Sequence, residues 1–116
     1  MLTLGPAKKI TIHLNEDTSS THDFLYREIF EFLLAQGVGG ASLIRPAAGF
    51  GKHRRIHAMH GEGVVGEHLP VRIEFIESPD RFEALLPDLI RLTTDGLIEA
   101  HDTTVLKVAN REPEPL

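Results

Sequence analysis

The chain has 116 residues, of which 12 are Lys or Arg, 17 are Asp or Glu, 7 are His and none is Cys, and its formal net charge is −5. This length fits one domain, and 41% hydrophobic with 25% charged residues is typical of a globular protein. The absence of Cys excludes a disulfide scaffold, a cysteine nucleophile and thiolate metal sites. No apolar run is long enough to span a bilayer and no signal peptide is recognisable, so we expect a cytoplasmic protein.

The negative charge is unevenly distributed along the chain. No Asp or Glu lies between Glu31 and Glu62, and the basic residues of that stretch are Arg45, Lys52, Arg54 and Arg55. An acidic chain is poorly suited to nucleic acid, whereas a local basic segment suits a compact anion. We therefore expect no nucleic-acid partner and place a candidate anion site in this segment.

The spacing of apolar residues predicts the elements in chain order. The ends, 1–7 and 111–116, are expected to be flexible tails. Residues 9–14 alternate between apolar and polar, which predicts a strand with one buried face. A helix that ends at Gly37 is predicted from apolar residues at helical spacing, namely Phe24, Leu25, Ile29, Phe32 and Leu33. A short strand follows over 41–47.

The second half begins with residues 49–68, which hold five glycines and little periodicity and therefore predict a long loop. Residues 71–76 alternate again and predict a third strand. A helix is expected to begin at Pro79, after a capping serine, and to be kinked or split at Pro87. Residues 97–108 have a β-like pattern and predict a last strand that is divided into two pieces near its middle.

This order predicts an α+β fold of the ferredoxin-like βαββαβ type, in which two helices cover one face of a four-stranded antiparallel sheet. We interpret residues 1–116 as a single domain of this kind. The opposite face would carry residues from alternate strand positions: Lys9, Thr11, His13, Arg72, Glu74 and Ile76. That mixture of polar and apolar side chains fits an oligomer interface.

The first candidate binding site is the segment 49–57. Glycines let backbone amides approach phosphate oxygens, and Lys and Arg add charge and hydrogen-bond donors. The candidate ligand-binding residues are Gly49, Phe50, Gly51, Lys52, His53, Arg54, Arg55 and His57, with Arg45 from the same basic stretch. The composition equally fits a solvated surface loop without a ligand.

Histidines in this segment allow a second interpretation. His53, His57 and His60 would share one face of a helical turn, which is a spacing found among metal ligands. Neighbouring arginines would repel a divalent cation, and no supporting carboxylate can be placed beside the histidines. Solvated loop histidines are therefore favoured over a metal site.

Other polar groups lie on or after the predicted strands. Acid–base candidates are His13, Glu74, Glu99, His101 and Asp102. Carboxylates on strands more often form interface ion pairs than catalytic sites, and no nucleophile motif is recognisable, so we expect no enzymatic activity. The polar run 15–17 ends the first strand and would either contact a ribose or form the turn into the helix.

Several short motifs carry a family likeness that extends over residues 9–108. They are Leu14-Asn15-Glu16-Asp17, Leu25-Tyr26, Gly39-Gly40-Ala41-Ser42-Leu43-Ile44-Arg45, Gly49-Phe50-Gly51, Ile56-His57, Leu69-Pro70-Val71 and Gly96-Leu97. Together they resemble the uncharacterised DUF 190 family, whose members look like relatives of the PII signal-transduction proteins. The glycine-rich basic run resembles the base of the PII T-loop.

This resemblance implies a homotrimer with clefts between subunits, an adenine nucleotide in each cleft, and a mobile loop over 49–68 that contacts a partner. It places residues 49–53 at the phosphate end of the cleft and Gly96 at its second glycine-bearing edge. Leu97 follows Gly96 where PII proteins carry a basic residue, which favours AMP or ADP over a triphosphate.

Two further expectations follow from the resemblance. No cofactor is required, and the partner it suggests is a membrane transporter or channel, because some relatives are associated with fluoride channels. The divalent-cation tolerance proteins share the same fold, and by that likeness the alternative is a metal-binding trimer that uses the loop histidines.

Overall fold

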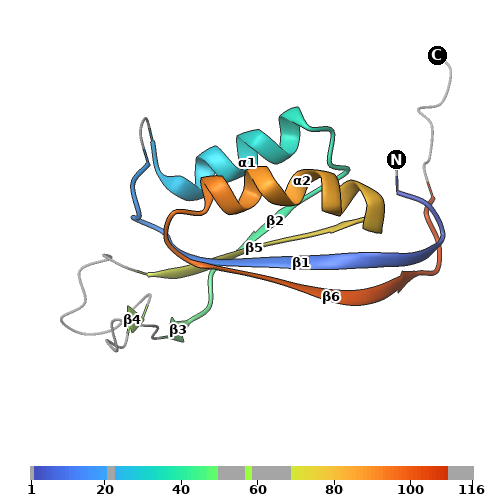
Figure 1. Ribbon diagram of the computed structural model, residues 1–116. Coiled ribbons are helices and arrows are strands. Elements are labelled where there is room, and N and C mark those ends of the chain that lie inside the picture. Colours follow the sequence, from blue (N-terminus) through green and yellow to red (C-terminus); the bar gives the residue numbers. More distant parts are fainter. Residues whose placement is uncertain (1, 21–22, 50–56, 59–68, 110–116) are drawn as a thin grey trace, which may run out of the picture.

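The computed structural model describes residues 2–20, 23–49, 57–58 and 69–109. Its elements, in chain order, are β1 (Gly5–Asn15), α1 (Leu25–Ala35), β2 (Ser42–Ile44), β3 (Ala48–Gly49), β4 (His57–Ala58), β5 (Pro70–Glu77), α2 (Pro79–Leu92) and β6 (Leu97–Val105) (Figure 1). The βαββαβ order is confirmed, with the short β3 and β4 strands added inside the expected loop.

Strands β1, β2, β5 and β6 form one antiparallel sheet in the order β2-β5-β1-β6. Strand β1 is central, because it pairs with β5 along one edge and with β6 along the other. Both helices lie on the same face of this sheet (Figure 1). The predicted α+β, ferredoxin-like class is therefore confirmed.

The hydrophobic core lies between the sheet and the helix layer. Its strand residues alternate along β1 and β5, and its helix residues recur every three or four positions. The core includes Ile10, Ile12, Leu14, Val71, Ile73, Phe75, Leu25, Ile29, Leu33, Phe82, Leu85 and Leu89. Phe24 was expected in the helical stripe, but it precedes α1 as the N-cap residue and is 40% exposed.

Helix α1 ends where the glycines predict. Gln36 is the C-cap residue, and Gly37 has a φ of +77°, a left-handed conformation that glycine adopts without a steric penalty. The Val38 amide then donates to the Leu33 carbonyl at 3.1 Å, which satisfies a terminal carbonyl. Among the described residues, no helix is long and apolar enough to cross a membrane.

Two strands are longer than the periodicity indicates. Strand β1 begins at Gly5, so residues 5–7 belong to the sheet rather than to a tail, and Gly5 pairs with Val105. Strand β6 is continuous from Leu97 to Val105 and does not divide in its middle. In both cases pairing between the two strands holds segments whose own apolar pattern is weak.

Helix α2 runs without a break through Pro87, so of the two expectations, a kink or a split, the split is wrong and the kink stays a prediction. It begins at Pro79 after Ser78, as predicted, although the serine side chain makes no capping hydrogen bond. Pro87 is exposed, and its missing N–H would have paired with the carbonyl of Glu83, which is an exposed residue as well. Water can therefore replace the lost hydrogen bond, and the helix continues.

Replacing Pro87 by Ala is expected to raise the free energy of unfolding by about 1–3 kcal/mol, because alanine restores the backbone donor and favours the helix. Urea denaturation measures the change. Pro79→Ala is the matched control: proline is favourable at the first helical position, so this variant should be no more stable than the parent chain. Equal stabilisation of both variants would contradict this account.

Candidate functional site

The candidate site lies at the end of the sheet where β1 and β2 stop and where β5 and β6 start. Strands β1 and β2 are both antiparallel to β5, so their last residues, Asn15 and Ile44, reach the same end. Pro70 and Leu97 begin β5 and β6 there. The segment 49–68, which carries most of the predicted binding residues, connects to this end, and β3 and β4 lie beyond it (Figure 1).

An ion pair joins two of these strand ends. The Nε and Nη2 atoms of Arg45 donate to Oε1 of Glu16, at 2.9 and 2.5 Å. The Glu16 amide donates to the Leu69 carbonyl at 2.8 Å, which ties the residue before β5 to the same place. Donating these hydrogen bonds to the Glu16 carboxylate raises the pKa of Arg45, so this predicted ligand residue is a fixed cation at the sheet end.

Gly96 directly precedes β6, and a glycine stands there for a steric reason. Its φ is +141°, and a Cβ atom on it would lie 2.4 Å from the carbonyl oxygen of His13 and 2.7 Å from Leu14. No side chain fits this close approach of two backbones, which the Asp95-Gly96 turn requires. Packing therefore explains why position 96 is a glycine. The resemblance also assigns Gly96 to the ligand cleft, and the contact of Gly96 with a ligand stays a prediction.

The base of the predicted binding loop is a small antiparallel pair. Gly49 of β3 pairs with His57 of β4, and Ala48 pairs with Ala58. The structure therefore brings the first and last residues of the 49–57 segment together. The other predicted ligand residues of this segment lie outside the described residues, and they are Phe50, Gly51, Lys52, His53, Arg54 and Arg55.

An aromatic–arginine cluster at the start of α1 was not singled out from the sequence. The rings of Phe24 and Tyr26 are nearly parallel, with centroids 6.2 Å apart, and the Arg27 guanidinium lies 5.8 Å from each centroid. Arg27 Nε also donates to the Tyr26 hydroxyl at 3.1 Å. The signal in the sequence was that Phe24 is the first residue of the predicted helical stripe, at a helix end where a side chain need not face the core.

The sheet face opposite the helices carries a first charged cluster, which we call the Glu74 cluster (Lys9, Arg72 and Glu74). Arg72 Nε lies 3.2 Å from Glu74 Oε1, and Lys9 Nζ lies 3.8 Å from Glu74 Oε2. One carboxylate thus stands between two permanent cations. These side chains come from β5 and β1 and were predicted on this face.

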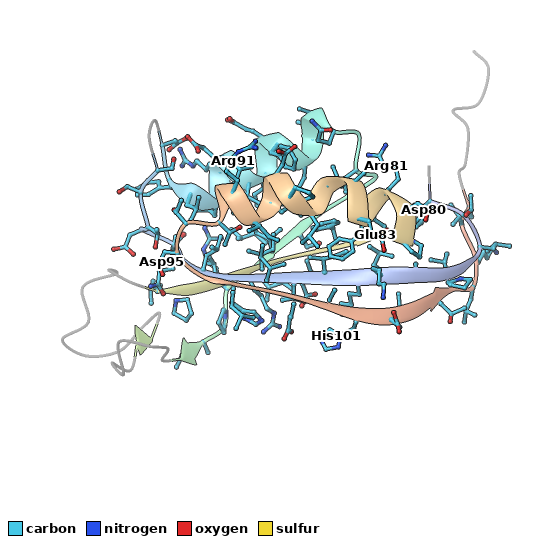
Figure 2. The ribbon with its side chains drawn as sticks, in the orientation of Figure 1. Asp80, Arg81, Glu83, Arg91, Asp95 and His101 are labelled. Atoms are coloured by element: carbon cyan, nitrogen blue, oxygen red, sulfur yellow. The ribbon has the colours of Figure 1, made fainter. Side chains whose placement is uncertain are left out.

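A second group on the same face, the Glu99 cluster (His13, Glu99 and His101), repeats this arrangement with imidazoles. Glu99 Oε1 lies 3.3 Å from His101 Nε2 and 3.5 Å from His13 Nε2. Hydrogen bonds from His101 and then His13 lower the pKa of Glu99. Figure 2 shows His101 on the side of the sheet away from the helices. Asp102, the remaining acid–base candidate, instead pairs with Lys8 at 2.5 Å.

The metal alternative rests largely on residues that the structure does not describe. Of its three histidines, only the backbone of His57 is described, within β4, whereas His53 and His60 lie outside. Within ranges 2–20, 23–49, 57–58 and 69–109, no group of three or more His, Cys, Asp or Glu residues is placed to hold a metal ion.

Comparison with known proteins identifies the relatives. Residues 7–105 match the family DUF190, described as "Uncharacterized ACR, COG1993". A UPF0166 protein of Aquifex aeolicus (strain VF5) is 29% identical over 99 residues, which cover 85% of this chain and 92% of that protein. The first of these matches spans most of the chain and all of the main sheet except the first two residues of β1.

Solved structures show the same fold. CPII, a nitrogen regulatory PII-like protein from Thiomonas intermedia K12 solved with ADP, AMP and bicarbonate, superposes with a TM-score of 0.60 at 19% identity, over 92% of this chain and 100% of that one. A protein from Thermus thermophilus, described as PII-like and signaling, gives a TM-score of 0.53 at 21% identity, over 90% of this chain and 91% of that one.

Gly96→Ala is expected to lower the free energy of unfolding by more than about 2 kcal/mol, because the added Cβ collides with backbone at a positive φ. Urea denaturation followed by circular dichroism measures it. Gly39→Ala is the control, since a Cβ there meets no atom within 4 Å. Unchanged stability of Gly96→Ala would contradict the steric account of this turn.

Proposed function

The chain belongs to the DUF190 family, and we propose that it is a PII-like ligand-sensing protein that binds an adenine nucleotide, AMP or ADP. The binding sites are clefts between the subunits of a homotrimer, at the sheet end described above. The observation that carries this proposal is the fixed cation Arg45 at the place where the basic, glycine-rich segment 49–57 leaves the sheet.

The chemistry of this sheet end suits a phosphate group. A guanidinium has five N–H donors, more than one oxygen of Glu16 can accept, so Arg45 can bind a second anion while it stays anchored. Gly49, in β3 beyond this end, adds backbone without a side chain. Lys52 and Arg55, from the segment 49–57, would add positive charge. The solved complexes of CPII with ADP and AMP support a nucleotide as the anion.

The proposed mechanism is conformational and requires no chemical step on the ligand. A nucleotide in the cleft favours one arrangement of the segment 49–68, which changes the surface that a partner meets. We propose that this partner is a membrane transporter or channel and that the protein acts in the cytoplasm. Residues 1–116 then serve as one regulatory domain.

Isothermal titration calorimetry with AMP and ADP tests the site. Lys52→Ala and Arg55→Ala should each weaken nucleotide binding by roughly tenfold or more, because each removes a charge-assisted hydrogen bond to phosphate. Arg91→Ala is the matched control, because Arg91 is an exposed arginine of α2 paired with Asp88 at 2.7 Å, in the helix layer, and its loss should leave the affinity unchanged.

Two outcomes would count against the proposal. Unchanged affinity in both loop variants would remove the site from segment 49–57. A thermal-shift series with AMP, ADP, Zn²⁺ and Cu²⁺ separates the two ligand classes, because a ligand that binds only the folded protein raises its melting temperature. A rise with the metal ions and none with the nucleotides would favour the metal-binding alternative.

A further inference from the structure

Glu16 places a negative charge at the sheet end to which the nucleotide is assigned. Its carboxylate oxygen Oε1 accepts hydrogen bonds from both Nε and Nη2 of Arg45, at 2.9 and 2.5 Å. The two residues come from separate segments, since Glu16 directly follows β1 and Arg45 directly follows β2. An anion of the chain itself therefore already shares the cation that the proposed site offers to a phosphate group.

The backbone on both sides of Glu16 holds it in this position. The Glu16 amide donates to the Leu69 carbonyl at 2.8 Å, and the Thr18 amide donates to the Asn15 carbonyl at 3.2 Å. The side chain of Glu16 is only 27% exposed. Because the backbone is fixed, only a rotation of the side chain itself could take the carboxylate away from Arg45.

The contact uses one edge of the guanidinium group of Arg45. Nε and the nearer hydrogen of Nη2 form this edge, and both point to Glu16. The next edge of the planar group consists of one hydrogen of Nη1 and the second hydrogen of Nη2, which form a parallel pair suited to bidentate binding of a phosphate. A phosphate on that edge and the Glu16 carboxylate would be separated by little more than the width of the guanidinium.

Two anions at this separation repel each other. At the surface of a protein, the Coulomb energy of two unit charges a few ångströms apart is large enough to change a dissociation constant several-fold. In the series AMP, ADP and ATP, each added phosphate group adds negative charge, so the repulsion grows along the series. The charge of Glu16 therefore disfavours a triphosphate more than a monophosphate.

The ion pair also lowers the positive charge that the basic stretch offers to a ligand. Four basic residues lie between Glu31 and Glu62, and one of them, Arg45, is neutralised by a carboxylate from outside that stretch. Arg45 keeps its hydrogen-bond donors, but the pair that it forms with Glu16 has no net charge. The site thus attracts a highly charged anion less strongly than the composition of the stretch indicates.

We propose that Glu16 is a specificity-determining residue of the nucleotide site, whose carboxylate positions Arg45 for a phosphate group and by its charge discriminates against ATP in favour of AMP. This inference rests on the proposed function and adds the residue that sets its ligand preference. Positioning and charge are separable properties of this side chain. A neutral amide in its place would still accept hydrogen bonds from Arg45 but would not repel a phosphate.

Isothermal titration calorimetry of the full chain with AMP, ADP and ATP, at low salt and without divalent cations, tests the inference. In Glu16→Gln, the dissociation constant for ATP divided by that for AMP should fall by about fivefold relative to the parent chain. Added NaCl should reduce this difference, because salt screens charges at the protein surface. Glu16→Asp retains the charge and should keep the ratio of the parent chain.

Glu16→Ala separates the two roles, because it removes both the charge and the hydrogen-bond acceptor. The ratio for ATP over AMP should fall as in Glu16→Gln, while the affinity for AMP itself should decrease severalfold as Arg45 loses its anchor. An unchanged affinity for AMP in Glu16→Ala would contradict the positioning role. Circular dichroism confirms that each variant is folded.

Glu83→Gln is the matched control and should leave the ratio unchanged. Glu83 is an exposed glutamate near the start of α2, at the opposite end of the sheet from Arg45 (Figure 2). An unchanged ratio in both Glu16→Gln and Glu16→Ala would overturn the assignment of specificity to Glu16 and leave the nucleotide site standing. A parent chain that binds none of the three nucleotides would overturn the proposed function and this inference together.

Discussion

The position of β1 between β5 and β6 is the constraint on which the rest of the molecule depends. One face of this strand supplies Ile10, Ile12 and Leu14 to the core, and the other supplies charged and polar side chains. Because the side chains of a strand alternate, a slip of one residue would exchange these two sets. The hydrophobic core thus fixes the register, and the register fixes which charges meet on the opposite face.

Much of the fold could be predicted because it follows from local periodicity. Alternation identifies β1 and β5, and the glycine at position 37 ends α1 in a way that a left-handed residue explains. The start of β1 and the continuity of β6 were less predictable, since Gly5 is held by its pairing with Val105 and the middle of β6 by its pairing with Lys8 and Lys9, and not by their own sequence patterns. Pro87 does not split α2, because water on the exposed side of the helix can replace the hydrogen bond that a proline removes.

The candidate site likewise has features that could be predicted from local sequence and features that depend on contacts between distant residues. Its basic composition is visible in the sequence, because the absence of acids is a property of a contiguous segment. The pairing of Arg45 with Glu16 was not predictable, since 29 positions separate them and only the parallel direction of β1 and β2 brings them to one end. The convergence of His13 with Glu99 depends likewise on pairing between β1 and β6, whereas Glu99 and His101 are already neighbours on one strand face.

The clamped base of the segment between β2 and β5 has a consequence for how such a protein can diversify. The rungs between β3 and β4 close the chain between Gly49 and His57 into a loop, and the Glu16–Leu69 hydrogen bond holds the residue before β5 at the end of the main sheet. The entropic contribution to the free energy of closing a loop grows slowly, by about 0.6 kcal/mol for each doubling of the loop's length. Insertions, deletions and wholesale exchange of residues beyond the clamp therefore cost the core little, and recognition can evolve faster than the scaffold that displays it.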